Sequence, residues 1–228
     1  MVKGQHIMRR CATTLEGDMT VDEHEFLLRV LRDGHFEGAH LEIGTAAGGT
    51  LCSMMRAFED DVRPPFVVVD RMTYFPNQLA TVRQNLTDQG LNPDTVDLRV
   101  ATSNDAFRRA MAGREEFDFM LIDATHKIFS VMADLRWTRL ISVGGVLCLH
   151  DYCKKFPGVR LAVDWFLRHH VNYEVIGQTG TLIAIRKTSA AKRREVGPLD
   201  RAYSVSMYLP LQIQRKANKW KTAKKTAA

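Results

Sequence analysis

The chain has 228 residues, 45% of them hydrophobic, and a formal net charge of +6. This size predicts one domain with a substantial core and argues against two full-sized domains. No apolar run reaches the roughly 18–20 residues that span a bilayer, and the first residues lack the apolar segment of a secretion signal, so we expect a cytoplasmic protein without a membrane span. The four cysteines form no CxxC pair, which argues against a disulfide framework and a zinc ribbon.

The predicted elements begin with a helix. Thr20 to Glu23 has the S/T-x-x-E form of a capping box, and apolar residues at helical spacing follow it. Beyond this helix, short apolar runs alternate with segments of helical spacing, which is the pattern of parallel strands joined by helices. In chain order, the alternating strands and helices are expected at residues 41–43, 51–58, 66–70, 79–86, 96–100, 105–111, 117–122, 128–141, 146–149 and 159–169.

The last two apolar runs depart from this alternation. Residues 173–176 and 181–185 are separated only by residues 177–180, a link too short for a helical crossover, so the two runs should pair antiparallel. The expected fold class is therefore α/β. It is a Rossmann-like doubly wound sheet of seven strands with the last strand antiparallel, plus an N-terminal helix and a basic C-terminal tail.

Positive charge is concentrated at the end of the chain. The segment from Arg186 onward contains 12 Lys and Arg and two acids, a net charge of +10, which leaves −4 for the preceding residues. We therefore divide the chain into an N-terminal segment (1–19), an α/β domain (20–187) and a basic extension (188–228) that we expect to be partly disordered. Nucleic acid or an anionic membrane would be attracted only through this extension.

A glycine-rich turn follows the first predicted strand. Glu42 is followed by Gly44 and Gly48 where the strand turns into a helix, so the backbone can approach a ligand closely and the helix N-terminus offers unpaired N–H groups. Asp70 ends the next strand, where doubly wound folds hold ribose hydroxyls. The two features predict an adenosine-type ligand. NAD(P) is the alternative, because the pattern G-x-A-x-x-G at 44–49 is one substitution from the dinucleotide fingerprint.

Acids and histidines follow two later strands. Asp123 and His126 come directly after one strand, and His150 and Asp151 after the next. Because the carboxyl ends of neighbouring strands line one crevice, we expect these four side chains to converge. Two adjacent carboxylates favour a divalent cation between them, and His126 could then act as a general base. Alternatively, the aspartates cap helices and His126 is an ordinary surface residue.

The predicted strand ends and helices together contain a set of motifs that is similar to that of a known family. They are Glu42-x-Gly44-x-x-x-Gly48, Ile122-Asp123-Ala124-Thr125-His126, Asp134-Leu135, Gly144-Gly145-Val146, His150-Asp151-Tyr152 and Gly158-Val159-Arg160-x-Ala162-Val163-Asp164. Over residues 20–186 the set resembles the class I S-adenosylmethionine-dependent methyltransferases, in particular the catechol-type and macrocin-type O-methyltransferases. The terminal hairpin is similar to the seventh strand of that family, which favours S-adenosylmethionine over NAD(P).

The resemblance implies a cofactor site. Gly44 would lie beside the methionine part of S-adenosylmethionine, Asp70 would hold the ribose, and residues 101–105 would border the adenine. The implied cofactor-binding residues are Glu42, Gly44, Thr45, Ala46, Gly48, Thr50, Asp70, Arg71, Ser103 and Asp123.

The resemblance also implies a divalent metal, Mg²⁺ in the family, with Asp123, His150 and Asp151 as ligands and His126 in the position of the base. His150 replaces the carboxylate or amide of the family. Mn(II) or Fe(II), a metal held by Asp123 and Asp151 alone, and no metal therefore all stay open.

The expected function is methylation of a hydroxyl on a small-molecule acceptor, such as a sugar or a natural product. One alternative is a metal-dependent hydroxylase on the same fold, with iron at Asp123, His150 and Asp151, although the sequence lacks a spaced H-x-D…H triad. Another is a non-catalytic cofactor-binding module that its basic tail recruits to nucleic acid. The sequence fixes neither the acceptor nor the oligomeric state, and a homo-oligomer stays open.

Overall fold

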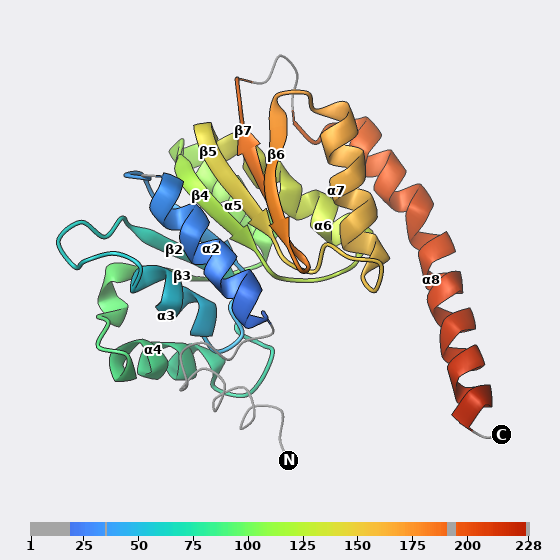
Figure 1. Cartoon of the computed structure of the whole chain (residues 1–228), viewed down its shortest axis with the longest axis horizontal. Coiled ribbons are helices and arrows are strands. Elements are labelled where there is room, and N and C mark those ends of the chain that lie inside the picture. The colour runs from blue at the N-terminus through green and yellow to red at the C-terminus, as the bar shows by residue number, and fades with distance from the viewer. Residues whose placement is uncertain (1–18, 35, 191–194, 227–228) are drawn as a thin grey trace.

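The computed structural model describes residues 19–34, 36–190 and 195–226, so nearly all of the predicted N-terminal segment lies outside the described residues. A seven-stranded sheet lies between two layers of helices, and a long C-terminal helix runs along one side of the molecule (Figure 1). The predicted fold class is confirmed, including the single antiparallel strand and the N-terminal helix. No described helix combines the length and the hydropathy that crossing a membrane requires.

The elements follow the predicted alternation of strands and helices. The strands are β1 (His40–Ile43), β2 (Phe66–Asp70), β3 (Val96–Val100), β4 (Phe117–Ile122), β5 (Ile141–Leu149), β6 (Tyr173–Thr179) and β7 (Leu182–Lys187). The helices are α2 (Val21–Gly34), α3 (Gly49–Met55), α4 (Gln78–Asp88), α5 (Ser103–Gly113), α6 (Ile128–Asp134), α7 (Pro157–His169) and α8 (Pro198–Thr226), with short 3-10 helices η1 (Pro93–Thr95) and η2 (Leu135–Leu140).

The strand order across the sheet is β3-β2-β1-β4-β5-β7-β6. Strands β1 to β5 pair in parallel, and β7 pairs antiparallel with both β5 and β6. The chain proceeds outward from β1 to β3 on one side and then resumes at β4 on the other side of β1. At such a switch point the loops after two neighbouring strands diverge, which leaves a crevice for a ligand at their carboxyl ends.

Each face of the sheet has its own hydrophobic core, because successive strand residues point to opposite faces. On β2, for example, Val67 and Val69 pack with helices α5, α6 and α7, whereas Phe66 and Val68 pack with α2, α3 and α4. The largest fully buried side chain is Trp137 of η2, in the α5–α7 core. With both faces covered, the strand ends are the part of the sheet left for a ligand.

Several boundaries differ from the sequence prediction. Helix α5 begins at Ser103 rather than 105, because the Thr102 side chain caps it by accepting from the Asp105 amide at 3.2 Å. The helix predicted over 128–141 ends as α-helix at Asp134 and continues as the 3-10 helix η2. The predicted link at 177–180 is wrong, since β6 extends to Thr179 and leaves only Gly180 and Thr181 in the turn.

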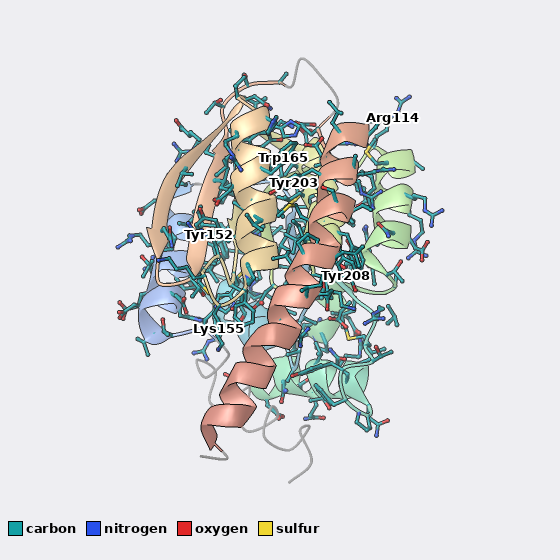
Figure 2. The ribbon with its side chains drawn as sticks, turned by 90° about the vertical axis from the view of Figure 1, so that its right-hand side faces the viewer. Arg114, Tyr152, Lys155, Trp165, Tyr203 and Tyr208 are labelled. Carbon is teal, nitrogen blue, oxygen red and sulfur yellow. The ribbon has the colours of Figure 1, made fainter. Side chains whose placement is uncertain are left out.

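The C-terminal segment, expected to be partly disordered, forms helix α8 over Pro198–Thr226. Helix α8 packs on α6 and α7, and the Tyr203 ring stacks on Trp165 of α7 with centroids 3.8 Å apart (Figure 2). Near its start, Asp200 accepts hydrogen bonds from Trp165 Nε1 at 3.0 Å and from the Gly197 amide at 2.7 Å. A buried carboxylate with these partners fixes the start of α8 against α7.

Candidate active site

A cleft of about 860 Å³ opens at the carboxyl ends of β1, β2 and β4. Every side chain predicted to bind the cofactor lines it: Glu42, Gly44, Thr45, Ala46, Gly48, Thr50, Asp70, Arg71, Ser103 and Asp123. His126 and Asp151 also line the cleft, whereas His150 is buried behind it. The fold therefore brings the predicted site residues to one cleft, except His150, which does not line it.

Gly44 allows the glycine-rich turn to pack against the end of β4. Its φ is +88°, and a Cβ at this position would lie 2.2 Å from the carbonyl oxygen of Asp123. Gly48 also has a left-handed φ, +85°, at the start of α3. The glycine at 44 is thus required by contact between two loops of the protein itself, in addition to any ligand.

Asp70 is fixed in place by backbone amides from two turns, the glycine-rich turn after β1 and the turn after β2. One carboxylate oxygen accepts from the Thr45 amide at 3.1 Å, and the other accepts from the Met72 amide at 2.6 Å. The buried hydroxyl oxygen of Thr45 has no hydrogen-bond partner among the described residues. An unpaired buried hydroxyl beside a fixed carboxylate suits a polar ligand that bonds to both.

Two amide side chains of α4, which sequence reasoning missed, hold the glycine-rich turn. Gln78 donates to the carbonyl of Ala46 at 2.8 Å, and Asn85 donates to the carbonyl of Ala47 at 3.0 Å. Gln78 and Asn85 are both buried and lie two helical turns apart, on the face of α4 that meets the turn. In the sequence their signal is a spacing of seven residues, which places two amide side chains on one face of the helix.

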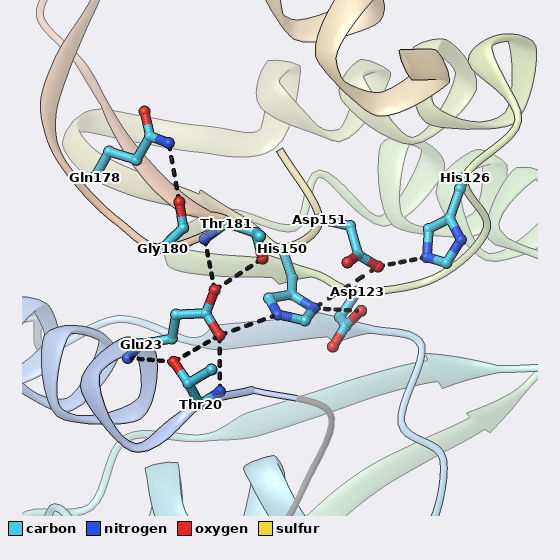
Figure 3. Close-up of polar contacts among 9 residues, drawn as sticks. All are labelled: Thr20, Glu23, Asp123, His126, His150, Asp151, Gln178, Gly180 and Thr181. Atoms are coloured by element: carbon cyan, nitrogen blue, oxygen red, sulfur yellow. Dashed lines mark hydrogen bonds and ion pairs between the residues drawn. The ribbon is translucent and has the colours of Figure 1, made fainter. Parts of the chain in front are cut away.

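The predicted cluster of acids and histidines forms at the other end of the cleft (Figure 3). Ligand atoms of Asp123, His150 and Asp151 all lie within 4.8 Å of one another. His150 Nδ1 is 3.3 Å from Asp123 Oδ1 and 3.9 Å from Asp151 Oδ2. Asp151, the second residue after β5, has a left-handed backbone with φ +63°, and its carboxylate points toward Asp123 and His126 (Figure 3).

His126 reaches this cluster from the loop after β4. Its Nε2 lies 2.6 Å from Asp151 Oδ2, and its ring packs on Phe156 with centroids 4.2 Å apart. The side chain is 42% exposed, and the residue lines the cleft. A histidine held by a carboxylate and open to the cleft can exchange a proton with a ligand there.

Glu23 of α2 is the member of the site that sequence reasoning missed. Its Oε1 accepts from the Thr181 amide at 2.5 Å and from the Thr181 hydroxyl at 2.8 Å, and its Oε2 accepts from the Thr20 amide at 2.7 Å and lies 3.6 Å from His150 Nε2. A Cβ on Gly180 would come within 2.5 Å of Oε1, so the β6–β7 turn needs glycine here. The predicted capping box is present, but the same carboxylate also contacts the site.

The charges around His150 and Glu23 set their protonation states. Burial by itself lowers the pKa of His150, but its hydrogen bond to Asp123 and the charges of Asp123, Asp151 and Glu23 outweigh burial and raise the pKa to about 9. Burial raises the pKa of Glu23, yet hydrogen bonds from Thr20 and Thr181 lower it to about 2. The result is an imidazolium between carboxylates on both of its ring nitrogens.

The opposite end of the cleft contains a further acid that was not predicted as a site residue. Asp134 of α6 lines the cleft, and burial raises its pKa to about 6 despite an opposing hydrogen bond with Ser103. Ser103 in turn accepts from Trp137 Nε1 at 2.9 Å. These polar groups border residues 101–105, the loop expected beside the adenine.

Comparison with known proteins shows what the central part of the chain resembles. A family profile described as a methyltransferase domain matches residues 41–152, which contain the glycine-rich turn, Asp70, Asp123, His126, His150 and Asp151. Over these residues the chain is similar to that methyltransferase family. A search among curated proteins found no significant match.

Solved structures share the fold of this chain at low sequence identity. An O-methyltransferase from Bacillus cereus in complex with SAH (S-adenosylhomocysteine) has 18% identity, a TM-score of 0.62, and coverage of 81% of this chain and 90% of its own. TomG from Streptomyces achromogenes, an O-methyltransferase of tomaymycin synthesis solved with SAM (S-adenosylmethionine), has 17% identity, a TM-score of 0.62 and coverage of 83% and 92%. The SAH-bound methyltransferase PaMTH1 from Podospora anserina has 16% identity, a TM-score of 0.61 and coverage of 83% and 89%.

Proposed function

We propose that the protein transfers the methyl group of S-adenosylmethionine to a hydroxyl of a small-molecule acceptor. The observation that carries this proposal is that one cleft joins the glycine-rich turn and Asp70 to Asp123, His126 and Asp151. A cofactor site and a proton-accepting group that open into the same cleft are what methyl transfer to oxygen needs. The SAM- and SAH-bound O-methyltransferases with this fold support the assignment.

The cofactor half of the cleft fits an adenosine-containing ligand. Asp70, with its oxygens oriented by the Thr45 and Met72 amides, would accept the ribose hydroxyls. The unpaired Thr45 hydroxyl and the close-packed turn at Gly44 would face the methionine part. The predicted contacts of Glu42, Ala46, Gly48, Thr50, Arg71 and Ser103 belong to the same proposal, because all six line the cleft.

The chemistry proposed for the other half is proton removal. S-adenosylmethionine supplies an electrophilic methyl carbon on a sulfonium sulfur. As the acceptor oxygen bonds to this carbon, the carbon–sulfur bond breaks and leaves S-adenosylhomocysteine. His126 takes the hydroxyl proton on Nδ1, because its Nε2 lies 2.6 Å from Asp151 Oδ2 and donates to that carboxylate; Asp151 thereby orients the ring and stabilises the imidazolium that forms.

A divalent cation fits the cluster by donor type and spacing, provided that it displaces the Nδ1 proton of His150. The 3.3 Å from His150 Nδ1 to Asp123 lies within the roughly 3.0–3.4 Å between neighbouring ligands of a cation bound at about 2.1 Å, and the 3.9 Å to Asp151 is longer than that range. Glu23, beside Nε2, would orient His150 so that Nδ1 faces Asp123. A bound cation would lower the pKa of an acceptor hydroxyl. One nitrogen ligand among oxygens suits Mn²⁺ or Fe²⁺ as well as Mg²⁺.

Calorimetric titration with S-adenosylhomocysteine tests the cofactor site. Binding to the wild type, at least about tenfold weaker binding to Asp70→Ala from the loss of a charge-assisted hydrogen bond, and unchanged binding to Asp61→Ala are expected. Asp61 is an exposed acid that does not line the cleft, which makes it the matched control. Failure to bind S-adenosylhomocysteine, or preferential binding of NADH, would overturn the proposed function. Repeating the titration with Mg²⁺ and with Mn²⁺ tests the cation separately.

The similarity to a methyltransferase domain argues against the hydroxylase alternative. The cytoplasmic location, the division at residues 20–187 and the small size of the acceptor are retained as proposals. Assays of S-adenosylhomocysteine release with phenolic, sugar and macrolide hydroxyls would distinguish acceptor classes.

A further inference from the structure

Helix α8 presents a row of large apolar side chains to solvent. Leu199 is 79% exposed, Val205 66%, Leu209 67% and Ile213 67%. At 100° per residue these positions fall on one side of the helix. Scattered single apolar residues are ordinary on a protein surface, but a row on one helix face indicates a surface that is covered when it functions.

The opposite side of α8 is the one that holds the helix to the α/β domain. Tyr203 stacks on Trp165, Ser204 is buried, and Tyr208 packs on Phe129 of α6 with ring centroids 5.1 Å apart (Figure 2). Since α8 is already anchored through these residues, the exposed row is not needed to fold the domain. Beyond them, α8 continues past the body of the molecule (Figure 1).

The sequence of the projecting part is strongly basic. Residues 201–228 contain seven Lys or Arg and no Asp or Glu, with six of the seven at 215–225. Trp220 follows Ile213 by seven residues, which is the spacing of two helical turns. An apolar row flanked by cations, with a tryptophan in helical register, is the pattern of a helix that lies in the interface of a membrane.

The positive charge of α8 indicates which kind of partner could cover the apolar row. A second copy of the helix would bring two strongly basic segments together without an acid on either, so the pair would repel. A nucleic acid would neutralise the cations but leave Leu209 and Ile213 in water. A bilayer with anionic headgroups satisfies both features, because its acyl region accepts the apolar row and its headgroups attract the Lys and Arg side chains.

We propose that α8 docks the protein on anionic membrane surfaces through the row Leu199, Val205, Leu209 and Ile213 together with the basic residues at 215–225. The helix lies on the membrane and does not cross it. Tyr208 of α8 contacts Phe129, which lines the cleft, so docking holds the cleft beside the membrane. This inference is independent of the methyl acceptor.

Vesicle sedimentation of the full-length protein tests the proposal. We expect binding to vesicles of phosphatidylcholine with 30% phosphatidylglycerol, much weaker binding to pure phosphatidylcholine, and a loss of binding as salt is raised. Leu209→Gln/Ile213→Gln should weaken binding about tenfold or more, because two apolar side chains leave the interface. Lys221→Glu/Lys225→Glu should weaken binding to the anionic vesicles by a similar factor without changing the apolar row.

The matched control is Val62→Gln/Val171→Gln, two valines that are 67% and 91% exposed on other parts of the surface. It should bind like the wild type, and circular dichroism should show all three variants folded. Equal binding to neutral and anionic vesicles, or an equal loss in the control, would contradict the proposal. An absence of vesicle binding would also contradict the proposal. In that case, a dimer in light scattering that Leu209→Gln/Ile213→Gln dissociates would indicate a second copy on the apolar row, and binding of a nucleic acid would indicate that partner instead.

Discussion

The carboxylate of Glu23 lies 3.6 Å from Nε2 of His150, on the side of the imidazole opposite Asp123. Glu23 belongs to the N-terminal helix, whereas His150 follows strand β5 near the middle of the sheet. The contact makes α2 part of the site, because the residue that caps the helix also neutralises a buried histidine. It connects the stability of α2 to the protonation of the site.

Glu23→Gln should remove a pH dependence of stability at acid pH. The pKa of Glu23 is about 2 in the fold against an ordinary value of 4.5. A lowered pKa means that the stabilisation is fully present above pH 4.5 and is lost as pH falls toward 2, with a size of about 3 kcal/mol. Urea unfolding of the wild type and the variant between pH 7 and 3 measures it.

The control for this prediction is Glu25→Gln, since Glu25 lies on the exposed side of the same helix. It should leave the free energy of unfolding and its pH dependence nearly unchanged. The charge of Glu23 also helps to raise the pKa of His150, so that pKa should fall from about 9 in Glu23→Gln, as followed by NMR of the ring protons. If the pKa of His150 is the same in both proteins, the coupling between the two residues is absent.

His126→Gln should slow methyl transfer with little effect on cofactor affinity. Loss of a general base costs about 10²–10⁴-fold in rate, and His126 contacts Asp151 at the acceptor end of the cleft. Single-turnover rates and S-adenosylhomocysteine affinity separate the two effects. His169→Gln, an exposed histidine on α7 outside the cleft, is the control. A rate for His126→Gln within a factor of three of the wild type would remove His126 from the mechanism.

Much of the cleft could be predicted because its residues sit at strand ends. Asp70, Asp123 and Asp151 each follow a short apolar run, and a parallel sheet brings such positions to one edge. Local spacing therefore located the acids without any knowledge of long-range contacts. The antiparallel hairpin was likewise predictable from a link too short for a crossover.

Long-range contacts explain what the sequence did not reveal. In the sequence, the capping box with Thr20 already explained Glu23. No residue near Glu23 in the chain indicated its contacts with Thr181 and His150. The basic composition of the C-terminal segment led us to expect partial disorder rather than helix α8. Yet Tyr203, Met207 and Leu211 recur at helical spacing and pack on the α5–α7 core. A highly charged segment can be ordered when a few apolar residues on one face find a partner.

Gly44→Ala should destabilise the protein more than an ordinary glycine substitution in a left-handed turn. Both Gly44 and Gly90 have positive φ, +88° and +72°, but a Cβ at 44 would meet the Asp123 carbonyl at 2.2 Å, whereas at 90 no described atom lies within 4 Å. We expect Gly90→Ala to cost about 1 kcal/mol from backbone strain alone. Gly44→Ala should cost about 2–4 kcal/mol because the clash adds to the strain, and it should also weaken S-adenosylhomocysteine binding. Equal costs, measured by urea unfolding, would mean that the two loops separate easily.

His40 should make the protein lose stability as pH falls from neutral toward 4. The residue is buried at the start of β1, its ring lies among Phe36, Phe58, Phe66 and Phe119, and neither ring nitrogen has a hydrogen-bond partner among the described residues. Burial lowers its pKa to about 4 from the ordinary 6.5, although the charge of Asp118 acts in the opposite direction. The fold therefore holds the neutral imidazole.

The sign follows from where the proton binds. As pH falls below 6.5, His40 is protonated in the unfolded chain, whereas in the fold it stays neutral until about pH 4. The free energy of unfolding therefore falls across that interval by about 3 kcal/mol. His40→Leu, which fills the same aromatic pocket without a titratable group, should flatten the slope between pH 6.5 and 4.5. Glu23→Gln should leave this interval unchanged, since its own effect lies below pH 4.5. Urea unfolding at four pH values on the two variants separates the contributions, and a slope that survives in His40→Leu would assign it to another group.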